Sequence, residues 1–157
     1  MFVLKKFLEN NNEIELFKIV DKIIRDTDFK YLYCKSNGIF SIGYNIDENK
    51  LTDSYYDLLA SEARQASLIA IAKGDVPLKH WNNLNRTMTI YKNYKGLISW
   101  SGTAFEYLMP NVNVAKYSGS LLDESCRFMI MCQIEYCKKL GIPWGISESA
   151  FNPKALY

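Results

Sequence analysis

Apolar residues recur every three or four positions between residues 13 and 25, and charged residues fill the positions between them. This spacing places the apolar side chains on one side of a helix. The pattern therefore predicts an amphipathic helix over residues 13–25 that packs one face against a core. The apolar positions are Ile14, Phe17, Val20, Ile23 and Ile24.

Two longer helices are predicted, over residues 53–73 and residues 121–140. The first would begin at Asp53, which can cap a helix N-terminus, and would end before Gly74. The second would end at Gly141, again a residue that suits a helix C-terminus. Both segments carry apolar residues on nearly every side, so we expect both helices to be buried.

Shorter elements are predicted between these helices. Alternation over residues 38–45 indicates a strand or hairpin arm, and residues 97–100 indicate a short extended segment. Short helices are expected within residues 77–86 and over residues 105–109, where Pro110 would end the second. The sequence thus predicts a mainly α fold with short β-hairpin pieces and long loops rich in polar and aromatic residues.

Composition indicates one globular domain, because 48% of the 157 residues are hydrophobic. The 19 basic and 17 acidic residues are interspersed, so no block is suited to follow nucleic-acid phosphates. No apolar run approaches the roughly 20 residues that a membrane-spanning helix needs, and the N-terminal apolar stretch is too short for a signal peptide. We therefore expect a cytoplasmic chain with no nucleic-acid partner and no membrane segment.

Metal and cofactor sites are not expected. The four cysteines lack the C-x-x-C spacing of zinc sites, and their number and spacing fit buried thiols. His80 is the only histidine, and it has no cysteine or aspartate partner at a metal-ligand spacing. We expect His80 to form structural hydrogen bonds, with sugar binding as the alternative.

Glu62 is the first candidate for chemistry. On the predicted helix it falls beside Tyr55 and Leu58, where a desolvated carboxyl would stay protonated, as a general acid requires. The alternative is a buried structural carboxylate that bonds to an arginine or to a helix end. Asp57 and Arg64 would share the opposite face, spaced for an ion pair or for binding sugar hydroxyls.

Glu148 follows a Pro-Trp-Gly loop and has a serine on either side, which favours a carboxylate that projects into a cleft. The alternative is an ordinary surface glutamate. Glycoside chemistry commonly uses two carboxyl groups, a proton donor and a nucleophile or base, and Glu62 and Glu148 are predicted to be that pair. Glu106 is the reserve carboxylate, that is, the next candidate for a catalytic role after Glu62 and Glu148. Aromatic residues that could stack on sugar rings, or fill a core instead, are Trp81, Trp100, Tyr107 and Trp144.

Three segments together resemble one protein family. They are residues 55–64 (YYDLLASEAR), residues 99–110 (SWSGTAFEYLMP) and residues 143–152 (PWGISESAFN). In this order, between about residues 28 and 152, the chain is similar to the glycoamylase-like cyclisation domain in the middle of cyclic β-1,2-glucan synthases.

The resemblance implies an α/α toroid, or six-hairpin barrel, in which a retaining transglycosylation closes linear β-1,2-glucan into a ring. It implies that Glu148 and Glu62 are the catalytic carboxylates, which we assign as nucleophile and acid/base. It also implies a β-1,2-glucan chain as partner, no cofactor, and full-length bacterial relatives that sit at the inner membrane. Candidate substrate-binding residues are Asp57, Arg64, His80, Trp81, Trp100, Glu106, Tyr107 and Trp144.

The chain departs from the family pattern at Asn85, where the family typically has glycine. A complete toroid has about twelve helices, more than twice what 157 residues can hold. Residues 1–157 are therefore expected to form part of such a domain, with the remaining parts of a split synthase as possible partners. The alternatives are an endo-β-1,2-glucanase-like hydrolase, a non-catalytic glucan-binding protein, or a remnant of a disrupted gene.

Overall fold

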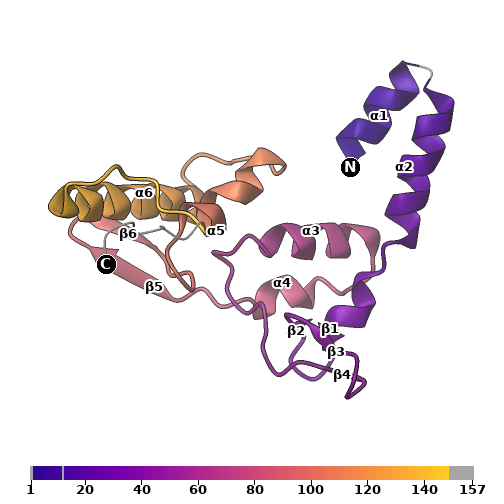
Figure 1. Ribbon diagram of the computed structural model, residues 1–157, viewed down its shortest axis with the longest axis horizontal. Coiled ribbons are helices and arrows are strands. Elements are labelled where there is room, and N and C mark those ends of the chain that lie inside the picture. The colour runs from indigo at the N-terminus through magenta and orange to yellow at the C-terminus, as the bar shows by residue number, and fades with distance from the viewer. Residues whose placement is uncertain (1, 12, 149–157) are drawn as a thin grey trace, which may run out of the picture. The chain divides into compact units, whose positions relative to one another are not determined.

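The computed structural model describes residues 2–11 and 13–148. The chain divides after Tyr31 into two units. Over the described residues the fold is mainly helical, with three short pairs of antiparallel strands (Figure 1). The predicted mainly α class with short hairpin pieces is confirmed at this level.

The first unit contains two helices that contact each other, α1 (Phe2–Asn10) and α2 (Ile14–Asp26). The amphipathic helix predicted over residues 13–25 is confirmed as α2, whose Val20 is buried. Arg25 and Asp21, one helical turn apart, form an ion pair at 2.7 Å. Helix α1 was not predicted. A short 3-10 helix, η1 (Phe29–Leu32), follows.

Two small hairpins begin the second unit. Ser41 lies between them and explains why the strand predicted over residues 38–45 is interrupted. Its hydroxyl lies 2.9 Å from the Gly43 carbonyl and 2.8 Å from the Thr52 carbonyl and can donate to either one, so the chain turns at this point. The hairpins pair β1 (Tyr33–Cys34) with β2 (Ile39–Phe40), and β3 (Tyr44–Asn45) with β4 (Lys50–Leu51).

The helix predicted over residues 53–73 is wrong in its first half, because α3 covers only Arg64–Lys73. The preceding backbone pairs with a distant segment instead. The Asn85 N–H donates to the Asp57 carbonyl at 2.6 Å, and the Leu59 N–H donates to the Asn85 carbonyl at 3.1 Å. Backbone groups used in this parallel bridge are not available for helical hydrogen bonds.

Helix α6 (Leu121–Leu140) has the bounds predicted for it. The Ser120 hydroxyl caps its N-terminus by accepting from the Asp123 N–H. Both α3 and α6 end at a glycine in the left-handed conformation, with φ of 78° at Gly74 and 68° at Gly141. A glycine adopts this conformation without a Cβ clash, so both predicted C-termini are correct.

The chain between α3 and α6 contains short elements. The predicted helices within residues 77–86 and over residues 105–109 are confirmed as α4 and α5. The extended segment predicted over residues 97–100 lies earlier, as strand β6 of a hairpin that was not predicted. The elements are α4 (Lys79–Asn83), β5 (Met88–Tyr91), β6 (Tyr94–Leu97), α5 (Ala104–Leu108) and η2 (Met109–Val112).

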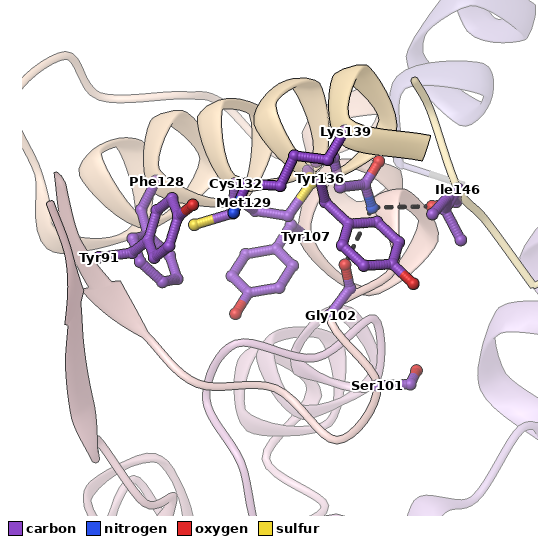
Figure 2. A pocket seen from close by; sticks show the side chains of 11 residues that line it. Tyr91, Ser101, Gly102, Tyr107, Phe128, Met129, Cys132, Tyr136, Lys139 and Ile146 are labelled. Carbon is purple, nitrogen blue, oxygen red and sulfur yellow. Dashed lines mark hydrogen bonds between the residues drawn. The ribbon is translucent and has the colours of Figure 1, made fainter. Parts of the chain in front are cut away.

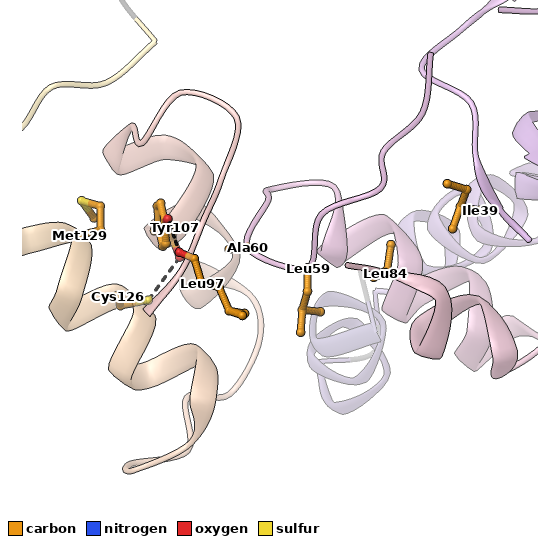
Figure 3. Close-up of a cluster of buried hydrophobic side chains, with 8 residues drawn as sticks. All are labelled: Ile39, Leu59, Ala60, Leu84, Leu97, Tyr107, Cys126 and Met129. Carbon is orange, nitrogen blue, oxygen red and sulfur yellow. Dashed lines mark hydrogen bonds between the residues drawn. The ribbon is translucent and has the colours of Figure 1, made fainter. Parts of the chain in front are cut away.

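Helix α6 packs along β6 and also contacts α5. Gly96 permits this close approach, because a Cβ at that position would lie 2.7 Å from the Phe128 side chain. The buried cluster of the second unit extends from β2 to α6 (Figure 3). Its members are Ile39, Leu59, Ala60, Leu84, Leu97, Tyr107, Cys126 and Met129.

Candidate functional site

The loop between β6 and α5 folds around the carboxylate of Glu106. Thr103 and Glu106 form a capping box at the start of α5. The Glu106 N–H donates to Thr103 Oγ1 at 3.4 Å, and the Thr103 N–H donates to Glu106 Oε2 at 2.9 Å. The first turn of α5 therefore holds Glu106 in one position.

Further donors from the same loop surround Glu106. Its Oε1 accepts from the backbone N–H of Trp100 at 3.0 Å, and its Oε2 accepts from the hydroxyls of Ser99 and Ser101 at 3.0 and 2.9 Å. Burial of this residue, which is 3% exposed, acts to raise the pKa of Glu106. The hydrogen bonds from Thr103, Ser101 and Ser99 outweigh burial and hold that pKa below its ordinary value. Glu106 is thus an ionised carboxylate whose oxygens are occupied by protein donors.

The Thr103 hydroxyl links Glu106 to Glu148. Thr103 Oγ1 lies 2.8 Å from Glu148 Oε1 and 3.0 Å from Glu106 Oε2. A hydroxyl carries a single proton and can donate to only one of these oxygens. Because Glu106 Oε2 already accepts from Ser99 and Ser101, donation to Glu148 satisfies both carboxylates best.

Helix α6 holds the segment that carries Glu148. The Gln133 Nε2 donates to the carbonyls of Gly102 and Ile146, each at 2.9 Å (Figure 2). The Ala104 N–H donates to the same Ile146 carbonyl at 2.8 Å. These bonds fix the chain two residues before Glu148 against both the start of α5 and the middle of α6.

Arg64, at the start of α3, is buried and bonds to backbone carbonyls. Its guanidinium donates to the carbonyls of Ser61, Glu106 and Tyr107 at 3.0, 3.1 and 2.8 Å. The helical spacing from which an ion pair with Asp57 was predicted is wrong, because α3 begins at Arg64 and does not contain Asp57. Burial, the largest cause, lowers the pKa of Arg64.

Glu62 lies just before α3 and is half-buried. The argument that placed it on the apolar face of a helix is wrong, because α3 begins only at Arg64. Ser61 donates its hydroxyl to Glu62 Oε2 at 3.3 Å, and the charge of Glu62 acts on the Arg64 guanidinium. Within the described residues no hydrogen bond joins Glu62 to Glu148, so the catalytic pair stays a prediction.

Asp57 and Trp100 meet at the surface beside the Glu106 loop. The Trp100 Nε1 donates to Asp57 Oδ1 at 3.1 Å, and the Trp100 ring lies 5.5 Å from the Tyr56 ring, centre to centre. Trp100 is exposed. The contacts hold an aromatic face in a fixed orientation, which is a feature that sugar-binding sites use.

The other predicted binding residues do not join this cluster. His80 is 0% exposed, and its ring nitrogens lie 2.8 Å from the Ser67 hydroxyl and 3.2 Å from the Gly38 carbonyl. Burial lowers the pKa of His80, so the ring is neutral. Trp81 packs against the core, and Trp144 is exposed on the segment after α6. The tyrosine predicted to bind sugar, Tyr107, donates its hydroxyl to the Leu97 carbonyl at 2.6 Å.

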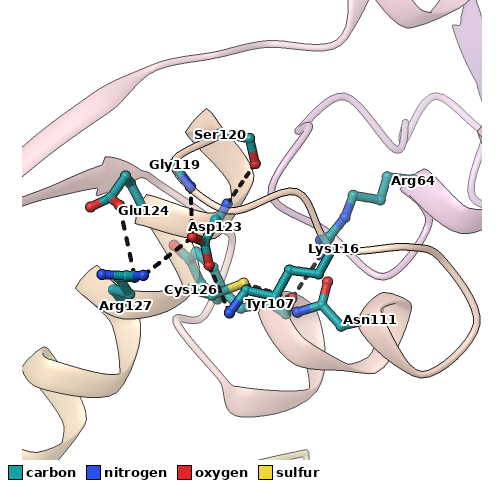
Figure 4. A network of polar contacts seen from close by, with 10 residues as sticks. All are labelled: Arg64, Tyr107, Asn111, Lys116, Gly119, Ser120, Asp123, Glu124, Cys126 and Arg127. Carbon is teal, nitrogen blue, oxygen red and sulfur yellow. Dashed lines mark hydrogen bonds and ion pairs between the residues drawn. The ribbon is translucent and has the colours of Figure 1, made fainter.

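A second polar network closes the N-terminus of α6 (Figure 4). Asp123 accepts from the Gly119 N–H at 2.9 Å and pairs with Lys116 at 2.7 Å and Arg127 at 3.5 Å. The Lys116 ammonium and the Gly119 N–H lower the pKa of Asp123. This network ties the chain before α6 to the helix, and its groups bond to one another.

Metal-binding and membrane features were sought among the described residues. These residues contain no group of three or more His, Cys, Asp or Glu side chains arranged to hold a metal ion. None of the described helices has the length and apolar character to cross a membrane.

Sequence reasoning missed the residues that organise the site. These are Ser99, Ser101, Thr103 and Gln133. The spacing of Thr103 and Glu106 is a capping-box signature and would have indicated their mutual hydrogen bonds. Gln133 has no such signal, because its partners lie 31 and 13 residues away.

Comparison with known proteins shows a similarity to a glucan synthase. No protein-family model matches the chain. The cyclic beta-(1,2)-glucan synthase NdvB of Rhizobium meliloti (strain 1021) is 45% identical over 127 residues, which are 81% of this chain. The match spans 4% of the length of that synthase.

Proposed function

We propose that this chain, which is related to a part of a cyclic β-(1,2)-glucan synthase, supplies part of a domain that closes linear β-1,2-glucan into a ring. The observation that carries the proposal is the 45% identity over 81% of the chain. Because the match spans 4% of the synthase, the activity is proposed for the complete domain. We propose an α/α toroid for that domain, and the helices of this chain would form part of it.

The proposed reaction is a retaining transglycosylation by Glu148 and Glu62. Glu148 attacks the anomeric carbon of a glucosyl residue while Glu62 gives a proton to the departing glucan oxygen. The bond between that carbon and the departing oxygen breaks, which leaves a glucosyl ester on Glu148. Glu62 then takes a proton from a hydroxyl at the other end of the same chain. That hydroxyl attacks the ester carbon, the bond to Glu148 breaks and a cyclic glucan leaves.

The contacts of Thr103 support Glu148 as the nucleophile. A hydrogen bond from a hydroxyl fixes the orientation of a carboxylate. No described residue donates to the second oxygen of Glu148, and we propose that this oxygen attacks the anomeric carbon. Glu106, which was the reserve carboxylate, is proposed instead to anchor the loop that presents Thr103.

The contacts of Trp100 and Arg64 support binding of the glucan. The Asp57 carboxylate holds the Trp100 indole at the surface, where a pyranose ring can stack on it. Arg64 supports the same region from below by bonding to the carbonyls of α5. We therefore propose Trp100 as a sugar contact, Asp57 as the residue that positions its ring, and Arg64 as a residue that positions the backbone of α5.

Product analysis tests the proposed function. Linear β-1,2-glucan is incubated with the chain joined to the rest of the domain, and the products are weighed by mass spectrometry. A product lighter by one water than the linear glucan of equal length supports cyclisation. Shorter linear glucans alone would favour the endo-β-1,2-glucanase-like alternative. Binding without any product would favour a non-catalytic glucan-binding protein.

A further inference from the structure

A cavity of about 550 Å³ lies beside the Glu106 loop, between α6 and the β5–β6 hairpin (Figure 2). Its volume is in the range of sites that hold small molecules. Three tyrosines from three different elements contribute to its wall, and Ser101 and Gln133 add polar groups. The tyrosines are Tyr91, Tyr107 and Tyr136.

The cavity adjoins the segment that carries Glu148. Ile146, which lines the cavity, precedes Glu148 by two residues. Gly102, also in the wall, precedes Thr103, whose hydroxyl bonds to Glu148. A ligand in the cavity would therefore lie against both loops that position this carboxylate.

Gln133 provides an unpaired acceptor. Its Nε2 donates to two carbonyl oxygens, and this fixes which end of the amide is the oxygen. Its Oε1 is buried and has no hydrogen-bond partner among the described residues, and the whole residue is only 6% exposed. Buried acceptors are rarely left unpaired, and no described residue supplies a donor to this one.

The remaining chemistry of the wall suits a neutral sugar. Tyrosine rings pack well on the apolar faces of a pyranose, and the Ser101 hydroxyl can bond to sugar hydroxyls. Among the described residues that line the cavity, Lys139 is the only charged one, and its ammonium can donate to sugar hydroxyls.

We propose that this cavity is a saccharide subsite that holds a glucosyl residue of β-1,2-glucan next to Glu148. The identity of the sugar rests on the proposed function. The subsite itself is tested by binding, so that its outcome is independent of whether cyclisation occurs.

The test uses the whole chain and linear β-1,2-gluco-oligosaccharides, with binding followed by NMR titration. Tyr136 is 55% exposed, so Tyr136→Ala removes a ring from the cavity without removing core packing. Loss of one stacked ring should raise Kd about 3- to 10-fold. Tyr136→Phe keeps the ring and should bind within about twofold of the unchanged chain. Tyr117→Ala, at a residue 73% exposed and outside the cavity, is the matched control and should leave Kd unchanged.

Three results would overturn the subsite. The first is no binding by the unchanged chain, and the second is equal Kd values for Tyr136→Ala and Tyr117→Ala. The third is found when the rest of the domain is joined to the chain: glucan binding is lost and Tyr136 becomes shielded from solvent. Another part of the protein would then occupy the cavity. Absence of cyclic product with binding intact would instead count against the proposed function alone.

Discussion

Two glutamates on either side of the Thr103 hydroxyl are held in opposite ways. Glu106 is buried, and backbone and hydroxyl donors from its own loop surround both oxygens. Glu148 is exposed, and within the described part of the chain Thr103 is its one hydrogen-bond donor. A carboxylate whose oxygens all accept hydrogen bonds from its own loop stabilises that loop, whereas a carboxylate with an oxygen that accepts no hydrogen bond can attack a substrate. The difference suggests that Glu106 serves structure and Glu148 serves chemistry.

The largest expected effect is the loss of activity in Glu148→Gln. The amide cannot form a glycosyl ester, so turnover of β-1,2-glucan in the complete domain should fall by several orders of magnitude. The exposed position predicts almost no change in the free energy of unfolding. Cyclisation rates and urea unfolding of the same preparation check both parts. Activity near that of the unchanged protein would remove Glu148 from the site.

A smaller loss of activity is expected in Glu62→Gln. Removal of a proton donor should slow cleavage of a poor leaving group by roughly 10²–10⁴-fold. An aryl glycoside with a good leaving group needs little protonation, so its first cleavage step should be largely restored. Burst kinetics with such a substrate measure that step. An equal loss with both substrates would show that Glu62 does not act as the acid.

Glu106→Gln should act mainly on stability. The new amide group would face backbone and hydroxyl donors, which leaves buried donors unpaired at a cost of about 3 kcal/mol. Urea unfolding measures this change. Glu124→Gln, at an exposed glutamate in the first turn of α6, is the control and should change stability by less than about 0.5 kcal/mol. Equal stability of the two variants would contradict the anchoring role.

Comparison of Glu106→Gln with the unchanged protein also tests how the stability contributed by Glu106 depends on pH. The pKa of Glu106 is lower in the folded protein than its ordinary value of 4.5, so the unfolded chain binds more protons between the two values. Its contribution to stability is fully present above about pH 4.5 and is lost as the pH falls through the folded value. Unfolding midpoints of the unchanged protein and of Glu106→Gln, measured at pH 3 to 7, should therefore converge at low pH. A constant difference across that range would contradict the pKa direction.

The smallest effect is expected for Thr103→Val, which tests the link between the two glutamates. Loss of the hydroxyl removes the donor to Glu148 and should lower kcat about 10-fold with little change in KM. Thr103→Ser keeps the hydroxyl and should restore kcat. The recovery of kcat in Thr103→Ser separates this role from a purely structural one, because a loss of stability alone would not lower kcat of the folded protein. An unchanged kcat in Thr103→Val would leave Thr103 as a helix cap only.

The sequence predicted the helices best where a capping residue marks the end of the helix. Ser120 and Gly141 define α6, and Gly74 defines the end of α3. The first half of the helix predicted over residues 53–73 failed, because apolar periodicity does not distinguish a buried extended segment from a helix. Its partner, Asn85, lies far along the chain. The β5–β6 hairpin was missed because Lys92, not glycine or asparagine, takes the positive φ in its turn.

The site was predictable only in part for a similar reason. The segments that resemble the synthase family brought Glu62, Glu106 and Glu148 forward, and the relationship to a cyclic β-(1,2)-glucan synthase is confirmed. The partition of roles between Glu106 and Glu148 depends on Thr103, which is 45 residues from Glu148 in the chain. Contacts at such a separation follow from tertiary packing and leave no periodic signal in one sequence.

Azide rescue tests most directly whether Glu148, and not Glu106, is the reacting carboxylate. In the complete domain, Glu148→Ala leaves space for azide to attack an activated aryl β-glycoside from the nucleophile's side, and the account predicts a glycosyl azide of inverted, α configuration. Glu106→Ala should lose stability and give no such product. An α-azide formed by Glu106→Ala and not by Glu148→Ala would contradict the assignment.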